Sequence, residues 1–180
     1  RAKSGVGFSY KWGGSQWCAS GCSPDFASCS PGVCMKTAGN GCPSCTHSGT
    51  YGADCSGFVG KVWGVPVEKS FKTKYHPYST KNFTHETTHW FHVDKNSKQS
   101  GDIFTYHTNG AGHVGLYEGT DPWGHTKVYH ARGCDFGIVY ENKVISSIYK
   151  YARRNALDNS ADCPPPYGCY FDTPAATSPC

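Results

Sequence analysis

Three features of the sequence predict an α+β fold in a single domain over residues 1–180. Segment 55–63 carries apolar residues at helical spacing, and several later segments are rich in β-branched and aromatic residues. A helix followed by an antiparallel meander of strands is an α+β arrangement. The composition includes 22 glycines, 12 tyrosines and one methionine, which suits a strand-rich domain better than a helical bundle.

The predicted helix covers Cys55–Trp63 and has recognisable start and stop signals. Its apolar residues at helical spacing are Phe58, Val59, Val62 and Trp63. Asp54 suits the N-cap, and Gly64-Val65-Pro66 ends the helix.

The predicted strands are Ile103–His107, His113–Tyr117, Lys127–Ala131, Gly137–Tyr140 and roughly Val144–Ala152. Gly, Asn or Asp separates most of them, as expected for an antiparallel meander. The segment 118–126 contains Asp121-Pro122-Trp123-Gly124, which favours a hairpin turn between the second and third strands.

Eleven cysteines indicate an oxidising compartment, so we expect a secreted, extracellular or periplasmic protein. The chain starts at Arg1 without an apolar signal segment, as a mature processed protein or a trimmed chain would, so this start says nothing against secretion. An odd number leaves at least one thiol unpaired, and Cys55 is the expected one because its neighbourhood differs from the others. Cys134 is a second candidate for a free thiol, although parity favours its being bridged.

Two cysteine-containing segments lack the apolar pattern of a core. The insertion, about 17–50, holds six cysteines, and the Pro-rich tail, about 155–180, holds three. We expect disulfides or a metal to hold the insertion and disulfides to pin the tail. Cys18-x3-Cys22 and Cys42-x2-Cys45, with His47 nearby, could bind zinc, but disulfides are favoured in a secreted chain. Cys42-Pro43-Ser44-Cys45 also resembles a redox pair, without the βαβ pattern of such proteins.

The charge pattern limits the classes of partner. The formal charge is +4, but no run of Lys or Arg forms a stripe, so we do not expect nucleic-acid binding. No apolar run reaches the length needed to span a bilayer. We expect a monomer that needs neither metal nor other cofactor.

Cys55 and two histidines form the candidate catalytic group. Backbone N–H groups and the macrodipole at a helix start lower a thiol pKa, and the same N–H groups can form an oxyanion hole. The alternative is a buried or disulfide-bonded structural cysteine. His113 lies between glycines at the start of an apolar strand and could be the base. If the next strand pairs antiparallel, His130 lies beside His113 and holds its imidazole in one tautomer.

These elements resemble the NlpC-type cysteine peptidases, a papain-like family of bacterial cell-wall hydrolases. The matching segments, in family order, are Tyr10-Lys11-Trp12-Gly13-Gly14, Asp54-Cys55-Ser56-Gly57-Phe58, Gly101-Asp102-Ile103-Phe104, His113-Val114-Gly115-Leu116-Tyr117 and His130-Ala131. Ala152-Arg153-Arg154 resembles the end of these domains. The resemblance covers roughly 5–16 and 51–155. The insertion, the many cysteines and the tail depart from the family pattern and put its usual substrate in doubt.

The resemblance implies a papain-like fold, with the helix that carries the nucleophile packed on an antiparallel sheet. Cys55 would be the nucleophile, His113 the base and His130 the residue that orients it. Tyr10 would lie near the nucleophile, and Asp54 and Ser56 match positions that contact the amino end of the substrate in some members. Each of these three has a structural alternative: Tyr10 could be a core residue, Asp54 only a helix cap, and Ser56 only a small residue. The implied substrate is a peptidoglycan stem peptide, cut between D-glutamate and a diamino acid.

Other functions remain open from the sequence. His85-Glu86-Thr87-Thr88-His89 matches the H-E-x-x-H pattern of zinc proteases, but the segment is poor in helix formers and that chemistry requires a helix. A catalytically idle cell-wall or glycan-binding module on the same fold is another candidate, as is an amidase with a substrate outside the cell wall. The presence of Cys55, His113 and His130 together favours the enzyme.

Overall fold

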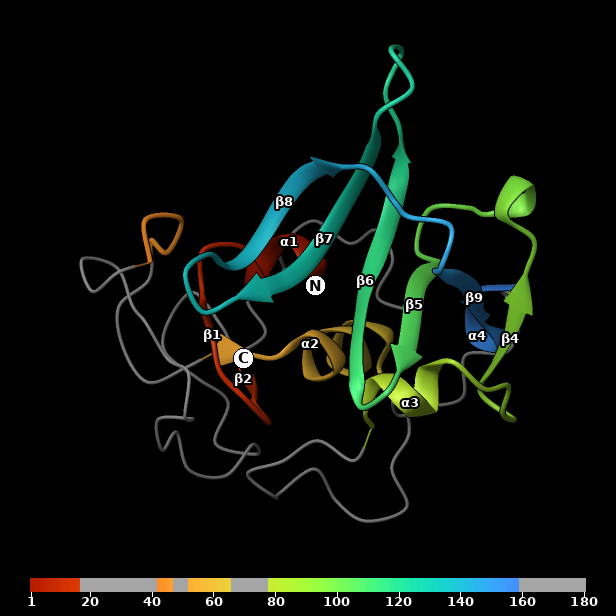
Figure 1. Cartoon of the computed structure of the whole chain (residues 1–180), viewed down its shortest axis with the longest axis horizontal. Coiled ribbons are helices and arrows are strands. Elements are labelled where there is room, and N and C mark those ends of the chain that lie inside the picture. The colour runs from red at the N-terminus through yellow and green to blue at the C-terminus, as the bar shows by residue number, and fades with distance from the viewer. Residues whose placement is uncertain (17–41, 47–51, 66–77, 159–180) are drawn as a thin grey trace, which may run out of the picture.

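The computed structural model describes residues 1–16, 42–46, 52–65 and 78–158 (Figure 1). Within these residues the fold is mixed α+β, and its main sheet is antiparallel. Most of the predicted insertion, including Cys18 and Cys22, lies outside the described residues, as does the tail from 159 on. The expectations for those parts stay predictions.

The helices of the described parts are short. They are α1 (Ala2–Gly5), α2 (Cys55–Trp63), α3 (Thr80–Phe83), the 3₁₀ helix η1 (Lys95–Ser97) and α4 (Asn155–Asp158). In the parts of the chain that the structure describes, none is long and apolar enough to cross a membrane. The strands are β1 (Ser9–Tyr10), β2 (Ser15–Gln16), β3 (Gly52–Ala53), β4 (Trp90–Val93), β5 (Ile103–Thr108), β6 (Ala111–Thr120), β7 (Thr126–Gly133), β8 (Gly137–Lys143) and β9 (Lys150–Arg154).

Helix α2 begins and ends where the sequence predicts. Asp54 has extended backbone and its side chain accepts a hydrogen bond from the Gly57 N–H, so it is the N-cap. Gly64 follows the last turn in the left-handed conformation, with φ 56°. A side chain at that φ would be strained, which explains why the helix ends at glycine.

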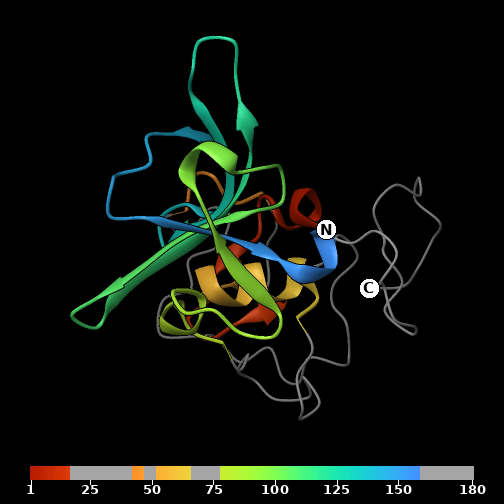
Figure 2. The same cartoon turned by 90° about the vertical axis from the view of Figure 1, so that its right-hand side faces the viewer.

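The main sheet has six strands in the order β4-β9-β5-β6-β7-β8. Strands β5 to β8 form the predicted meander, each antiparallel to the next. Helix α2 packs against β6 and β7 and lies on one side of this sheet (Figures 1 and 2). The catalytic helix of the prediction is therefore in contact with the strands that carry both histidines.

The last strand differs from the prediction. A strand was expected over roughly Val144–Ala152, but β9 starts at Lys150 and pairs with β5 and β4. Val144 is 91% exposed, whereas Tyr151 is buried and lies opposite Phe104 of β5. Tyr151 and Ala152 are buried at the far edge of the meander, so the chain crosses to that edge before it re-enters the sheet.

A small sheet of order β1-β3-β2 brings the N-terminal segment to the start of α2. The sequence analysis did not predict it, because each strand has only two residues. Strand β1 pairs parallel with β3, with Tyr10 opposite Ala53. A Cβ at Gly52 would lie 2.2 Å from the Ser9 carbonyl oxygen, so this close approach requires glycine. The pairing positions Tyr10 next to the chain that leads into Cys55.

The core lies between α2 and the sheet. Its fully buried members include Phe58, Val59, Ile103, Val114, Ala131 and Ile138. At the far end of α2, Trp63 packs against Phe83 and Trp90, with ring centroids 5.9 and 6.2 Å away. The Trp63 indole also donates to the Gly101 carbonyl at 2.8 Å. Both ends of α2 are therefore anchored, which holds Cys55 at a defined place against the sheet.

A buried ion pair ties β9 to the start of β5. The Arg153 guanidinium donates to both oxygens of Asp102, at 2.9 and 3.0 Å, and both side chains are buried. This bidentate geometry compensates the cost of burying the two charges. Gly101-Asp102 and Ala152-Arg153 are far apart in the sequence, and this ion pair joins them.

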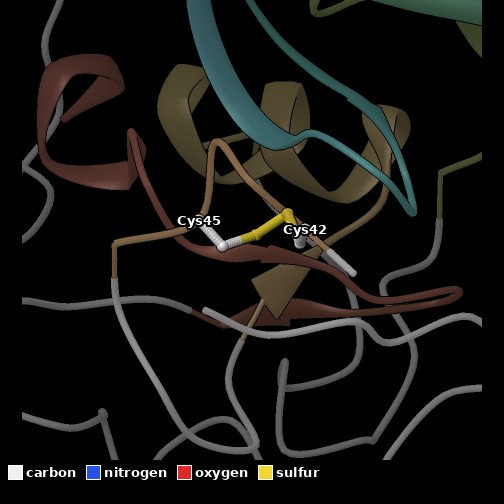
Figure 3. The surroundings of a disulfide bond; sticks show 2 residues. All are labelled: Cys42 and Cys45. Carbon is white, nitrogen blue, oxygen red and sulfur yellow. A yellow bond between two sulfur atoms is a disulfide. The ribbon is translucent and has the colours of Figure 1, made fainter. Parts of the chain in front are cut away.

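Cys42 and Cys45 form a disulfide (Figure 3). The zinc interpretation of this pair is therefore wrong, and the disulfide expectation is confirmed for it. Both residues are buried, and the Cys45 sulfur would be 2.8 Å from a Cβ placed on Gly137 at the start of β8. Cys134 is also disulfide-bonded, as parity favoured.

Candidate active site

Cys55 is free, and it is the free thiol that parity predicts among the described cysteines. It is buried, with 7% of its surface exposed, at the first residue of α2. Its sulfur interacts with the backbone N–H groups of Ser56 and Val114 as well as its own. Val114 follows His113 directly, so the thiol lies against the strand that carries the candidate base. The Cys55 thiol and the His113 ring are not hydrogen-bonded to each other in this state.

The pKa of Cys55 moves opposite to the prediction. Burial raises it to about 12, and the negative charge of Asp54 raises it further, while the three N–H groups lower it. The cost of removing a thiolate from water is therefore larger than the stabilisation that the N–H groups at the helix start give to it. In this state Cys55 is a neutral thiol, and it must lose its proton to a base before or during attack.

Asp54 organises the start of the helix. Its Oδ1 accepts from the Gly57 N–H at 2.7 Å and from the Ser56 hydroxyl at 3.0 Å. Its Oδ2 accepts from the Gly13 N–H at 2.9 Å. Asp54 and Ser56 are both buried. Their polar atoms thus serve the cap and its link to the Gly13 turn, and a role in holding substrate stays a prediction.

His113 and His130 lie together as predicted from the pairing of β6 with β7. His113 Nε2 is 2.7 Å from His130 Nδ1. Burial lowers the pKa of both imidazoles, and the positive charges of Lys143 and Arg132 add to this for His130. His130 is 1% exposed. Both rings are therefore neutral near pH 7, which is the form in which His113 can accept a proton.

Glu141 extends this pair on β8, and the sequence analysis missed it. Its Oε1 is 2.9 Å from His130 Nε2, and its Oε2 accepts from Arg132 Nη1 at 2.8 Å. Strand register gives the reason: Glu141 lies opposite Val128, two residues before His130 on the same face of β7. The alternation along Gly137–Lys143 would have identified Glu141 once the pairing of β7 with β8 was known.

Gly115 and Phe104 support the two histidines. Phe104 contacts both rings, with centroids 6.2 Å from His113 and 6.3 Å from His130. A Cβ at Gly115 would lie 2.4 Å from Phe104 Cζ and 2.8 Å from His130 Cβ. Position 115 therefore has room for glycine alone, and this keeps Phe104 and His130 in place.

Two tyrosines come near the thiol from different parts of the chain. Tyr10 of β1 is 9% exposed, and its pKa is raised by burial and by the charges of Cys55 and Asp54. Tyr149, just before β9, has its pKa raised to about 12 by burial, Tyr106 and Cys55. Both phenols are protonated donors at neutral pH. The sequence predicted Tyr10 but not Tyr149, because 144–149 was taken for strand.

The Tyr149 ring is fixed by edge contacts. Its centroid lies 4.8 Å from that of Tyr106 and 5.3 Å from that of Phe104. Tyr106 pairs with His113 across β5 and β6. Aromatic side chains therefore line β5 next to the histidines.

The zinc-protease pattern does not have the geometry it needs. His85 and His89 follow the last residue of α3 and lie in turns, not on a helix. The His85 ring is 2.8 Å from the Lys81 carbonyl, and Glu86 accepts from the His92 N–H. Across the described residues, no group of three or more His, Cys, Asp or Glu side chains is placed to hold a metal ion.

Comparisons with protein-family models, with curated proteins and with solved structures find no match for this chain.

Proposed function

We propose that this protein is a papain-like cysteine amidohydrolase of the NlpC type, with Cys55 as nucleophile. One observation carries the proposal: a free Cys55 starts a helix that packs against the strand of His113, and His130 holds the His113 ring. A nucleophile, a base and a group that orients the base are the parts that thiol-dependent acyl transfer needs.

The chemistry follows from these positions. His113 Nε2 is engaged by His130, so Nδ1 takes the proton from the Cys55 thiol as the sulfur attacks an amide carbonyl carbon. The oxyanion accepts hydrogen bonds from backbone N–H groups at the start of α2 and from the Tyr10 hydroxyl. Protonated His113 then donates to the leaving amine as the C–N bond breaks. A water molecule, deprotonated by His113, releases the acid from the acyl-enzyme and restores the thiol.

The raised pKa of Cys55 fits this order of events. A neutral thiol beside a neutral imidazole has no preformed ion pair, so proton transfer accompanies attack. Substrate binding changes the solvation of the sulfur and brings the thiol and the His113 ring into hydrogen-bond contact, since catalytic hydrogen bonds tighten in the substrate complex.

For the substrate we propose peptidoglycan stem peptides, cut between D-glutamate and a diamino acid, outside the cytoplasm. The support is the resemblance of the segments that surround Cys55, His113 and His130 to the NlpC-type family. Two disulfide-bonded sites, at Cys42–Cys45 and at Cys134, are compatible with an extracytoplasmic location.

Digestion of a defined muropeptide, with products identified by mass spectrometry, tests the proposal. The wild-type chain should release a new amine at the D-glutamyl bond, and Cys55→Ala should release none. Iodoacetamide under non-reducing conditions should modify Cys55 and stop the reaction. Cys55→Ala that still digests the muropeptide would refute the proposal, provided that circular dichroism shows both proteins folded.

A second candidate is an idle binding module on the same fold, since the Cys55 thiol is not hydrogen-bonded to the His113 ring in this state. If the protein is such a binding module, the wild-type chain should bind purified peptidoglycan in a sedimentation assay but release no product. Cys55→Ala should bind equally well.

A further inference from the structure

The hydrogen bonds on β6, β7 and β8 form a line that ends on a charged pair. It runs from His113 to His130, then to Glu141 and finally to Arg132, with distances of 2.7, 2.9 and 2.8 Å. Its middle members are buried or half-buried, with side-chain exposures of 1% for His130 and 23% for Glu141. Each bond needs one donor and one acceptor, so the state of one end decides the state of the next.

Glu141 sets the direction. An ionised carboxylate can only accept, so His130 Nε2 must carry a proton and donate to Oε1. A neutral imidazole has one N–H, so His130 Nδ1 is an acceptor. His113 Nε2 must then be the donor in the 2.7 Å bond. The remaining nitrogen of His113, Nδ1, is left unprotonated.

Arg132 fixes which oxygen of the Glu141 carboxylate faces which partner. Its Nη1 donates to Oε2, which leaves Oε1 for His130. The positive charge of Lys143 also lowers the pKa of both histidines. The negative charge of Asp54, the N-cap of α2, acts on the Cys55 thiol.

We propose that Glu141 is a positioning residue that fixes the tautomers of His130 and His113 and so leaves His113 Nδ1 as the base. The role of Nδ1 as base rests on the proposed function, whereas the tautomers do not. Glu141 acts through two histidines and does not touch the reacting atoms.

The tautomers can be read directly in the wild-type protein. Long-range nitrogen–proton correlation spectra of ¹⁵N-histidine-labelled full chain should show both rings protonated on Nε2, with assignments from His113→Gln and His130→Gln. Either ring protonated on Nδ1 would overturn the proposal. This measurement needs neither substrate nor a Glu141 variant, so it stands even if such a variant does not fold.

Glu141→Gln gives a directional test. Arg132 still requires an acceptor, so it holds the amide oxygen and turns the amide NH₂ toward His130 Nε2. Both tautomers should then reverse, and His113 Nδ1 should carry a proton. Muropeptide hydrolysis should fall roughly 100-fold in kcat with little change in KM, because a base in the wrong tautomer cannot take the thiol proton.

The double variant Arg132→Ala/Glu141→Gln frees the amide to rotate. Its oxygen can face His130, so the original tautomers and much of the activity should return, although two side chains are changed. Glu118→Gln is the matched control. Glu118 is a carboxylate of the same sheet that accepts from Tyr129 and Tyr140, and its loss should leave the histidine spectra unchanged.

The outcomes separate the two proposals. Reversed tautomers in Glu141→Gln, with a wild-type chain inactive on every muropeptide, would support the positioning role and refute the proposed function. Unchanged tautomers and unchanged kcat in Glu141→Gln would overturn the positioning role alone.

Discussion

The two halves of the candidate site are built in different ways. The nucleophile half is local: Asp54, Cys55, Ser56 and Gly57 are consecutive, and the cap that holds them is made by neighbouring atoms. The base half is assembled from three strands, with His113, His130 and Glu141 brought together by the register of the sheet. Burial favours the neutral form in both halves, raising the pKa of the thiol and lowering those of the histidines. The nucleophile half meets the sheet through the Val114 N–H and the packing of α2 on β6 and β7, whereas the base half depends on the register of three strands.

The largest effect is expected from the base half. His113→Gln removes the proposed proton acceptor for a thiol whose pKa is raised by burial, so kcat should fall by roughly 10²- to 10⁴-fold. The measurement is muropeptide hydrolysis at saturating substrate. His125→Gln, at the exposed tip of the β6–β7 hairpin, is the control and should keep full activity. An active His113→Gln would mean that the thiol finds its base elsewhere.

The packing of the base half can be broken without touching a polar group. Gly115→Ala places a methyl group 2.4 Å from Phe104 and 2.8 Å from His130 Cβ, so we expect a loss of about 1–3 kcal/mol in the free energy of unfolding. Urea unfolding measures this. Gly119→Ala, on the same strand with nothing within 4 Å of its Cβ, should cost far less. Equal losses in both variants would show that Phe104 and His130 move aside freely.

Stability should also depend on pH through the base half. Burial lowers the pKa of His113 and His130 from 6.5, so the unfolded chain binds more protons than the folded chain below that pH. The free energy of unfolding should therefore decrease as the pH falls below 6.5, with its full contribution present above it. Urea unfolding at several pH values checks this. His130→Gln should flatten the curve, and a curve with the wild-type slope would contradict the burial of a neutral imidazole.

The smallest effect is expected from the local half, and a matched pair of variants sharpens it. Asp54→Asn keeps an oxygen for the Gly57 N–H but removes the charge that raises the pKa of Cys55, so that pKa should fall. The amide NH₂ that replaces Oδ2 cannot accept from the Gly13 N–H, so this variant loses that one hydrogen bond. Asp54→Ala also loses the cap, which costs about 1 kcal/mol more. The pH dependence of alkylation by iodoacetamide reports the thiol pKa. An unchanged profile in Asp54→Asn would show that burial alone sets it.

Local patterns in the sequence determined the helix and most of the meander. The spacing of apolar residues in 55–63, Asp54 before it and Gly64 after it were sufficient, because helix starts and stops depend on adjacent residues. Runs of β-branched and aromatic residues, separated by Gly, Asn or Asp, located β5 to β8. Adjacent strands of a meander pair with each other, which brought His130 to His113. Parity identified Cys55 as the free thiol among the described cysteines.

Tertiary structure alone decided the features that depend on distant segments. Strand β9 lies beside β5 because Tyr151 is buried there, and no local sequence pattern identifies β5 as the partner of β9. Glu141 joins the histidines only through the register of β8 on β7. The direction of the Cys55 pKa shift was also out of reach, because it depends on how completely the fold removes the sulfur from water. A helix start lowers the pKa of an exposed thiol, but here burial is the larger effect.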